Sequence, residues 1–370
     1  MSSLWIIFAV ALVLAALIDN RDITFRLNGY QKRDRLLTFA LLLMLAFFCG
    51  LRTWGNDTPT YRMMFEQMPL WDNYWEETTY TYSGGIGFGI LTSIIKTMGF
   101  SSQDYLMFYA FLTVIPYVLF VRKYSKTLLF GIFLMFVTGF YTFSLAAIKQ
   151  SMATGLCLLA VDSAIEKKWI RYGIFMFLAC MFHPYALVYL LVPFVFFKPW
   201  TKYTFIFMGF SILASIYLES LLGTVLDVTD MMGAEYDETS FTGEGVNIFR
   251  VMVSFVPLIL ASFYGKNLFK NFTRAEDLLF NLAMLNALIM FVGLFGTANY
   301  FARLANYFLP AQVVILPAVL ARFHQKEKQW LVPLCILGYL GYFYYENNII
   351  RPFATSYTHM SLWDYLSTLF

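Results

Sequence analysis

The stretch CGLRTWGNDTPTYRMMF, residues 49–65, is where the second apolar run of the chain ends. Arg52 stands at the rim of that run, and the pair Thr58–Pro59 favours the start of a short external helix. Asp57 and Tyr61 flank this start. One interpretation is that Arg52 marks a membrane border and the rest is a loop. The alternative is that this rim forms half of an active site.

The composition is that of an integral membrane protein. The 370 residues are 59% hydrophobic and 13% charged, with a mean hydropathy of +0.63, which is too apolar for an ordinary soluble domain. Apolar runs of spanning length recur along nearly the whole chain, whereas a membrane barrel shows short alternating segments. We therefore predict an all-α, polytopic helical membrane protein, a single domain over 1–370 with about twelve transmembrane helices. The net charge of +3 is too small to indicate a nucleic-acid partner.

The cysteines and the first apolar run are also interpreted as membrane features. The four cysteines form no CxxC or Cys/His cluster, so we predict small buried residues rather than disulfides or metal ligands. They are Cys49, Cys157, Cys180 and Cys335. The run 4–18 lacks a basic start and a clear cleavage site, so it is predicted to be the first span rather than a secretory signal.

Lys and Arg residues cluster in alternate connections, which the positive-inside bias places in the cytoplasm. The first cluster puts the N-terminus outside. The clusters are Arg21, Arg26, Lys32, Arg33 and Arg35; Arg122, Lys123 and Lys126; Lys167, Lys168 and Arg171; Lys198 and Lys202; Lys266, Lys270 and Arg274; and Arg322, Lys326 and Lys328. The apolar runs between them are expected to pair as hairpins: 127–143 with 147–165, 170–183 with 185–197, 203–222 with 248–264, and 277–296 with 303–321, followed by a last span at 329–345.

Two large connections are predicted to face outward. Residues 52–84 combine acidic and aromatic side chains, and residues 223–247 carry six Asp or Glu and neither Lys nor Arg. The Gly-rich segment 85–99 is interrupted by Lys96, and counting it as a crossing would move the next basic cluster outside. We therefore predict that 85–99 is an interfacial or re-entrant helix on the outer face.

Polar residues from several hairpins fall at the same outer level under this topology. Arg52, Lys149 with Gln150, His183 and Arg303 all lie at outer ends of apolar runs. Arg52 and Lys149 have a simple structural explanation as interface anchors, and His183 has one as a hydrogen-bonded corner before Pro184, whereas Arg303 is harder to explain in this way. Together they indicate a site, because polar groups in membrane helices are costly and tend to mark pathways or chemistry.

The motif ANYFARLANYF adds a polar stripe. Asn299, Arg303 and Asn306 are spaced by four and three residues, so they fall on one helical face that is predicted to point inward. An arginine between two asparagines suits an anion held against a protein wall.

Cations and aromatic residues at this level fit a lipid whose phosphate-linked sugar lies outside. Guanidinium groups bind a diphosphate and stabilise the charge that builds as it leaves. His183 has a pKa range suited to accepting a proton from a hydroxyl. The aromatic segment WDNYWEETTYTY at 71–82 suits sugar rings. Nucleotide, HExxH and DxD motifs are missing from the sequence, so we expect no cofactor and cationic residues rather than a metal ion at the leaving group.

Four blocks of the sequence resemble the EpsG-type branch of bacterial exopolysaccharide and O-antigen polymerases, the Wzy group. These blocks are GLRTWGNDTPTYRMMF at 50–65, AAIKQSMATGLCLLA at 146–160, FHPYALVYLL at 182–191 and NYFARLANYF at 299–308.

The resemblance implies an enzyme that joins oligosaccharide repeat units carried on undecaprenyl diphosphate, at the outer face of the bacterial cytoplasmic membrane. It matches Arg52, Asp57, Gln150, His183 and Arg303 to recurring motif residues. Lys149 stands where the family commonly has Arg, and a lysine lacks the planar two-pronged contact. A GT-C-like helical architecture is compatible with this analogy. The implied partners are the lipid-linked oligosaccharide, membrane lipid, a flippase and a chain-length regulator.

The resulting hypothesis assigns a role to each residue of the rim. His183 and Asp57 are the catalytic candidates. Arg52, Arg303 and Lys149 are assigned to the diphosphate. The residues assigned to other parts of the substrate are Tyr61, Gln150, Asn299 and Asn306.

Two other functions stay open from the sequence. A transporter or flippase of the same lipid-linked oligosaccharide needs the cations but no chemistry, and only an enzyme lengthens repeat units in detergent. A membrane O-acyltransferase acting on polysaccharide would use His183 as base and leave an ester on the glycan.

Overall fold

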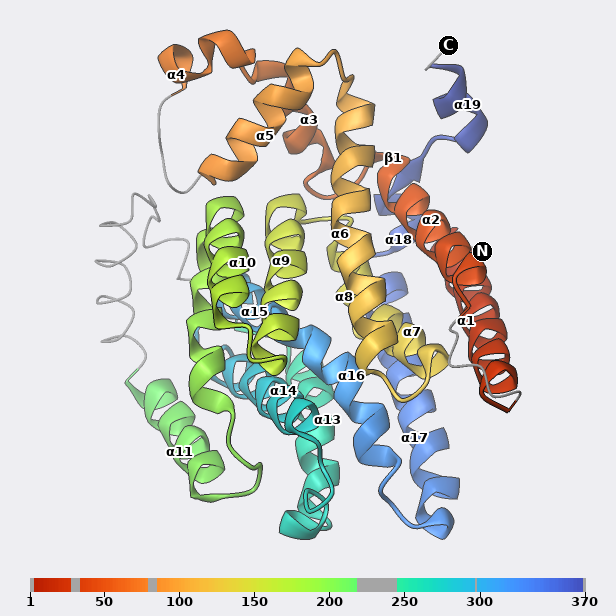
Figure 1. The fold of residues 1–370 in the computed structure, drawn as a ribbon, viewed down its shortest axis with the longest axis vertical. Coiled ribbons are helices and arrows are strands. Elements are labelled where there is room, and N and C mark those ends of the chain that lie inside the picture. The colour runs from red at the N-terminus through yellow and green to blue at the C-terminus, as the bar shows by residue number, and fades with distance from the viewer. Residues whose placement is uncertain (1–2, 28–33, 79–84, 218–244, 297, 369–370) are drawn as a thin grey trace.

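Helices make up most of the computed structural model, which describes residues 3–27, 34–78, 85–217, 245–296 and 298–368 (Figure 1). The longer helices are α1 (Ser3–Leu27), α2 (Leu36–Gly50), α6 (Ser102–Tyr124), α7 (Leu128–Val137), α9 (Ile148–Ile165), α10 (Trp169–Phe182), α11 (Lys202–Ile216), α13 (Ile248–Ser262), α14 (Arg274–Val292), α15 (Ala298–Asn306), α16 (Leu309–Leu320) and α17 (Gln325–Tyr344). Shorter turns of helix are α8 (Phe140–Phe143), η3 (Pro184–Val195), η5 (Gly265–Asn267) and η6 (Tyr345–Ile350).

A second group of short elements covers one end of these helices, the upper end in Figure 1. They are β1 (Arg52–Trp54), α3 (Thr58–Gln67), η1 (Trp71–Asn73), α4 (Tyr74–Glu77), α5 (Ile86–Thr97), α18 (Phe353–Ser356), β2 (Thr358–His359) and α19 (Leu362–Ser367). The strands β1 and β2 pair antiparallel and join the two distant parts of this group, with Arg52 opposite His359. The fold is therefore helical with one small sheet that periodicity did not predict.

Among the described residues, three helices are long and apolar enough to cross a membrane. They are Ser3–Ile23, Ser102–Tyr124 and Arg274–Val292, and the bent pair Tyr300–Asn306 with Leu309–Leu320 makes up to four. The other apolar helices are shorter. An all-α membrane protein is consistent with this structure, and the expected number of about twelve spans stays a prediction.

Several predicted spans are interrupted in the structure. The expected span 127–143 is broken because α7 ends at Val137 and Gly139 adopts a left-handed φ of +82°. The segment 185–197 is the 3₁₀ helix η3, which begins at Pro184 and contains Pro193. The prediction of one continuous helix over 127–143 was therefore wrong, whereas the 185–197 segment is helical without a break over Pro184–Val195.

The span predicted over 303–321 is likewise interrupted. Helix α15 ends at Asn306, and α16 follows after a bend of 55°. Pro310 lies in the first turn of α16, where its missing N–H is tolerated but cannot continue the preceding helix.

The predicted interfacial segment 85–99 forms α5, which lies at the upper end beside α3 and packs against α6 and α10 (Figure 1). Its 12 residues reach only about 18 Å, short of the roughly 30 Å of a hydrocarbon core. The ammonium group of Lys96 donates to the carbonyl oxygens of Glu66 and Met68, so this lysine ties α5 to the end of α3. The segment therefore fits a helix that does not cross.

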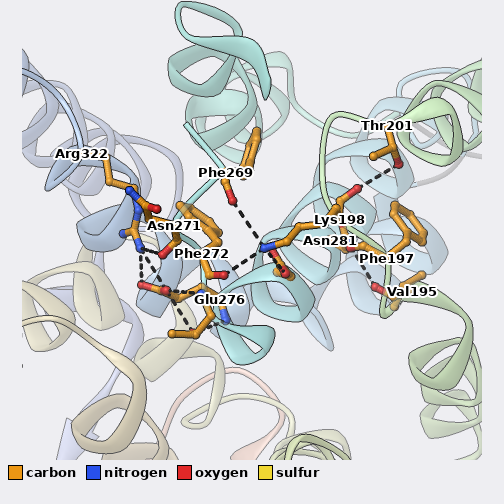
Figure 2. A network of polar contacts seen from close by, with 12 residues as sticks. Val195, Phe197, Lys198, Thr201, Phe269, Asn271, Phe272, Glu276, Asn281 and Arg322 are labelled. Atoms are coloured by element: carbon orange, nitrogen blue, oxygen red, sulfur yellow. Dashed lines mark hydrogen bonds and ion pairs between the residues drawn. The ribbon is translucent and has the colours of Figure 1, made fainter. Parts of the chain in front are cut away.

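The predicted basic connections gather at the other end of the molecule, where acidic residues join them. Glu276 lies 3.0 Å from Arg322 and 3.3 Å from Lys126. Asp277 lies 2.8 Å from Lys198. Figure 2 shows Arg322, Glu276 and Lys198 converging around the start of α14. Four connections that are far apart in sequence thus share one end, as the charge pattern predicts.

Helix α16 runs through the centre of the bundle. All 12 of its residues are buried, and it packs against α6, α7, α13, α14 and α17. All four cysteines are free, and Cys49 and Cys157 are buried. The predicted external loop 52–84 contains α3, η1 and α4, while residues 79–84 lie outside the described residues. The loop predicted at 223–247 also lies outside them, apart from 245–247.

Candidate active site

A cavity of about 620 Å³ lies among α7, α8, α13, α14, α15 and α16, below the β1–α3 turn. The segment that follows α17 closes another of its sides. Its charged lining residues are Asp57, Arg250, Arg303, Glu346 and Arg351. The cavity therefore holds three guanidinium groups and two carboxylates inside an otherwise apolar bundle.

Arg303 and Asn306 both line this cavity, as expected from their spacing on one face of α15. The side chain of Arg303 is exposed, while the backbone of α15 is anchored by two amides. Gln150 donates from Nε2 to the carbonyl oxygen of Arg303, and Asn286 donates from Nδ2 to that of Ala305, 2.7 Å away. The side chain of Asn299 lies outside the described residues.

Asp57 reaches the same cavity from the turn between β1 and α3, and Arg52 fixes that turn from behind. Arg52 is only 1% exposed and does not line the cavity. Its Nε donates to the Thr58 hydroxyl over 3.2 Å, and its Nη1 donates to the carbonyl oxygen of Cys49. This guanidinium therefore holds the end of α2 against the start of α3.

The helix start predicted at Thr58–Pro59 is confirmed, but Thr58 is the first residue of the helix rather than its N-cap. The N-cap of α3 is Asp57, and its side chain makes no capping hydrogen bond. Thr58 is fully buried and uses its hydroxyl oxygen to accept from Arg52 instead. The Asp57 carboxylate is consequently left for the cavity.

His183 ends α10 directly before Pro184 and does not line the cavity. Its Nδ1 lies 3.0 Å from the hydroxyl of Tyr307, at the bend between α15 and α16. The ring of Tyr185 stands edge-on at 5.0 Å. Arg303 and Lys149 lie near enough to act electrostatically on the imidazole. His183 therefore lies close to α15, the helix that carries Arg303, without lining the cavity itself.

Lys149 and Tyr61 lie on the side of α5, outside the lining of the cavity. The Lys149 ammonium stands 5.0 Å from the centre of the Phe88 ring, a cation–π contact, and the Lys149 backbone N–H donates to the Tyr61 hydroxyl over 3.4 Å. Burial raises the pKa of Tyr61 to about 12, so its hydroxyl stays protonated. Arg303, Arg52 and Asp57 also lie within electrostatic range of this hydroxyl.

The structure brings further groups to the cavity that the sequence did not single out. Arg250 forms two hydrogen bonds with the Glu346 carboxylate, of 2.9 and 2.6 Å. Arg351 lines the same region. The sequence offered two signals, Arg250 near the start of the 248–264 run and Glu346 after the last span. Because 96 positions separate them, no local pattern indicated that they pair.

His359 is a second residue that sequence reasoning missed. It sits opposite Arg52 in the small sheet, and its ring stacks on Phe48 with centroids 4.4 Å apart. Burial lowers the pKa of His359 to about 4, so the imidazole is neutral near pH 7. Its buried Nε2 has no hydrogen-bond partner in the described part of the chain.

Apolar helices around a cavity with several guanidinium groups define the class: a helical membrane protein with a site suited to an anionic ligand. The chain belongs to the EpsG family, whose family model matches residues 35–365. Membership implies a role as an exopolysaccharide polymerase in general terms. No curated protein and no solved structure matches the chain.

Proposed function

We propose that this protein is a glycosyltransferase of the Wzy type that joins oligosaccharide repeat units carried on undecaprenyl diphosphate. In this proposal the reaction takes place at the outer face of the bacterial cytoplasmic membrane. The observation that carries it is the cavity that Arg303 and Asp57 both line, although they come from elements far apart in the sequence. Family membership supports a polymerase in general terms, and the lipid carrier, the repeat unit and the GT-C-like architecture are parts of this proposal.

Arg303 and Arg351 are the cavity cations proposed to hold the diphosphate. Neither forms an ion pair within the described residues, whereas Arg250 is neutralised by Glu346. A guanidinium donates two parallel N–H groups to phosphate oxygens and stabilises negative charge that develops on them. The charge needed at the leaving group is thereby supplied by side chains, without a metal ion in the proposed step.

The proposed reaction is a substitution at the anomeric carbon of the growing chain. A hydroxyl oxygen of the incoming repeat unit forms a bond to that carbon, and the bond from the carbon to the diphosphate oxygen breaks. Asp57 accepts the hydroxyl proton, because it is the lining carboxylate that forms no ion pair in the described structure. The lipid diphosphate departs with the bonding electrons and is stabilised by the arginines.

The remaining predicted site residues are given positioning roles in this proposal. Arg52 orients the turn that carries Asp57. His183, through Tyr307, and Gln150, through the backbone of Arg303, hold the arginine helix. Lys149 and Tyr61 lie at the side of the site, where the lipid-linked sugar or its prenyl chain would enter. A flippase and a chain-length regulator are the proposed partners.

The test uses purified protein and lipid-linked repeat units in detergent, where no membrane has to be crossed. We expect the wild type to lengthen the glycan and Arg303→Ala to lower the rate by at least about a hundredfold, as loss of a transition-state donor does. Arg303→Lys should recover only part of the rate, because a lysine lacks the fork geometry.

Arg171→Ala is the matched control, since Arg171 is an exposed arginine at the start of α10, remote from the cavity. It should keep the wild-type rate. Wild-type protein that moves lipid-linked sugar in vesicles but never lengthens it would favour a flippase. Ester formed on the glycan from a labelled acyl donor would favour an acyltransferase. Either result would overturn the proposal.

A further inference from the structure

Five of the uncharged polar side chains that line the cavity lie beside its charged groups, and four of these five keep only acceptor capacity for a ligand. They come from the C-cap of α7 and from α8, α13, α14 and α16, and most of these helices pack directly on one another. We call them the acceptor wall: Thr138, Thr142, Ser254, Asn286 and Gln312.

The three hydroxyl groups of the acceptor wall already donate their protons to backbone carbonyl oxygens. Thr138 donates to the carbonyl oxygen four residues earlier over 2.7 Å. Thr142 and Ser254 each donate to the carbonyl oxygen three residues earlier, over 3.2 and 2.7 Å. A hydroxyl has one proton and two lone pairs, so what each of these groups keeps for a ligand is acceptor capacity.

The amide of Gln312 is fixed by the backbone of α13. Pro257 has no N–H, so the carbonyl oxygen of Val253, four residues earlier, lacks its helical donor. Gln312 supplies that donor from Nε2 over 2.6 Å and directs the same nitrogen to the Tyr339 hydroxyl over 2.9 Å. Because a carbonyl oxygen only accepts hydrogen bonds, the Gln312 amide cannot flip and place its own oxygen against Val253. Its oxygen Oε1 is left buried and without a partner among the described residues.

Asn286 repeats this arrangement one helix away. Its Nδ2 donates to the carbonyl oxygen of Ala305, where α15 approaches its end. Its oxygen Oδ1 is buried with no hydrogen-bond partner in the described structure. Asn286 keeps one further N–H, while the other four members have no proton left to offer.

We infer that the acceptor wall is the subsite that binds an uncharged sugar ring through its hydroxyl or amide N–H donors, beside the arginines that hold the diphosphate. This inference rests on the proposed function. A cation is a poor occupant, because the wall contains no carboxylate and three arginines line the same cavity. Phosphate is equally unsuited to a wall of acceptors. A sugar hydroxyl satisfies oxygens that are otherwise unpaired, and a site built this way discriminates against ligands that lack the hydroxyl.

The experiment compares affinities in detergent for two kinds of probe. One is undecaprenyl diphosphate without sugar; the others are undecaprenyl diphosphates that carry glucose, galactose or N-acetylglucosamine. The ratio of the two affinities measures what the sugar adds. The test variant is Thr138→Val/Ser254→Ala, which removes two hydroxyls of the wall with little change of shape.

The chain offers a matched control, Thr38→Val/Ser163→Ala. Thr38 is 6% exposed and Thr138 7%, and both donate to the carbonyl oxygen four residues earlier. Ser163 is fully buried and donates to the carbonyl oxygen four residues earlier, while Ser254 is 3% exposed and donates to the one three residues earlier. Neither control residue lines the cavity.

We expect at least one sugar-bearing probe to bind the wild type and the control more tightly than the sugar-free probe. The test variant should lose about two- to tenfold of that gain per hydroxyl, the usual net effect of one hydrogen bond, while its affinity for the sugar-free probe stays unchanged. An equal sugar gain in test and control variants, or no gain for any sugar in the wild type, would overturn the inference. Failure of the proposed function would be seen separately. In that case Arg303→Ala would leave the affinity for the sugar-free probe at the wild-type value.

Discussion

Arg52 and Arg303 share a side-chain type and a predicted task, but the fold gives them different surroundings. Arg52 is 1% exposed and donates hydrogen bonds to the Thr58 hydroxyl and to the carbonyl oxygen of Cys49. Arg303 is exposed to the cavity, and only its backbone is held. At the scale of the residue, the first arginine therefore belongs to the architecture of the site and the second is free for a ligand.

Substitution should separate these two roles. Arg52→Ala is expected to lower the melting temperature in detergent as well as activity, because each buried acceptor left unpaired costs about 1–3 kcal/mol. Arg303→Ala should lower activity while the melting temperature stays near that of the wild type. Differential scanning fluorimetry with the polymerisation assay measures both quantities. An Arg52→Ala protein with wild-type melting temperature would contradict the structural role.

At the scale of the element, the segment after α17 completes the cavity from outside the main bundle. Arg351, Phe353 and Tyr357 line the cavity from this segment. It is held by strand β2 against β1, by the Met360 N–H donating to Leu51 over 3.0 Å, and by the Tyr365 hydroxyl donating to Asp104 over 2.8 Å. Pairing with β1 is thus what keeps Arg351 at the site.

This pairing predicts a specific crosslink. The hydroxyls of Thr53 and Thr358 lie 2.8 Å apart, so Thr53→Cys/Thr358→Cys should form a disulfide on mild oxidation. Mass spectrometry of a non-reduced digest detects the joined peptides. Thr53→Cys with Thr355→Cys is the control and should crosslink poorly, because Thr355 is an exposed residue of α18 outside the strand pair. Equal crosslinking of the two pairs would mean that the strand register is wrong.

At the scale of the whole molecule, charge is divided between the two ends. Lys126, Lys198 and Arg322 come from different connections and meet Glu276 and Asp277 at the start of α14. Figure 2 shows Lys198, Arg322 and Glu276 in this group. The aromatic and acidic elements α3, η1 and α4 lie at the opposite end (Figure 1). The positive-inside bias then orients the cavity elements toward the outer face in our proposal.

That orientation is tested by labelling from outside the cell. Leu70 is 50% exposed next to η1, and Lys326 is exposed at the start of α17. A membrane-impermeant maleimide should label Leu70→Cys in intact cells and Lys326→Cys only after the membrane is opened. The unsubstituted protein, with its four native cysteines, sets the background. Labelling of Lys326→Cys in intact cells would reverse the orientation.

Local features of the site were predictable because they depend on neighbours in sequence. The spacing of Arg303 and Asn306 is a property of one helix, and both line the cavity. The start of α3 after Asp57 likewise needed only the Thr-Pro pair. Helix breaks were harder, because Gly139 and Pro310 each end a span only when tertiary packing offers partners to the freed backbone groups.

The amino-acid sequence alone determined that this protein is helical and made for a membrane, which end of its helices carries the basic charge, and which short motifs bear polar groups. These properties follow from hydropathy, charge and helical period, which act over a few residues. Only the tertiary structure decided that Arg250 meets Glu346, that β2 holds Arg351 at the cavity, and that Arg52 and His183 stand behind its lining. Such contacts join residues up to some 300 positions apart, and they are fixed by how apolar helices pack, which no local pattern records.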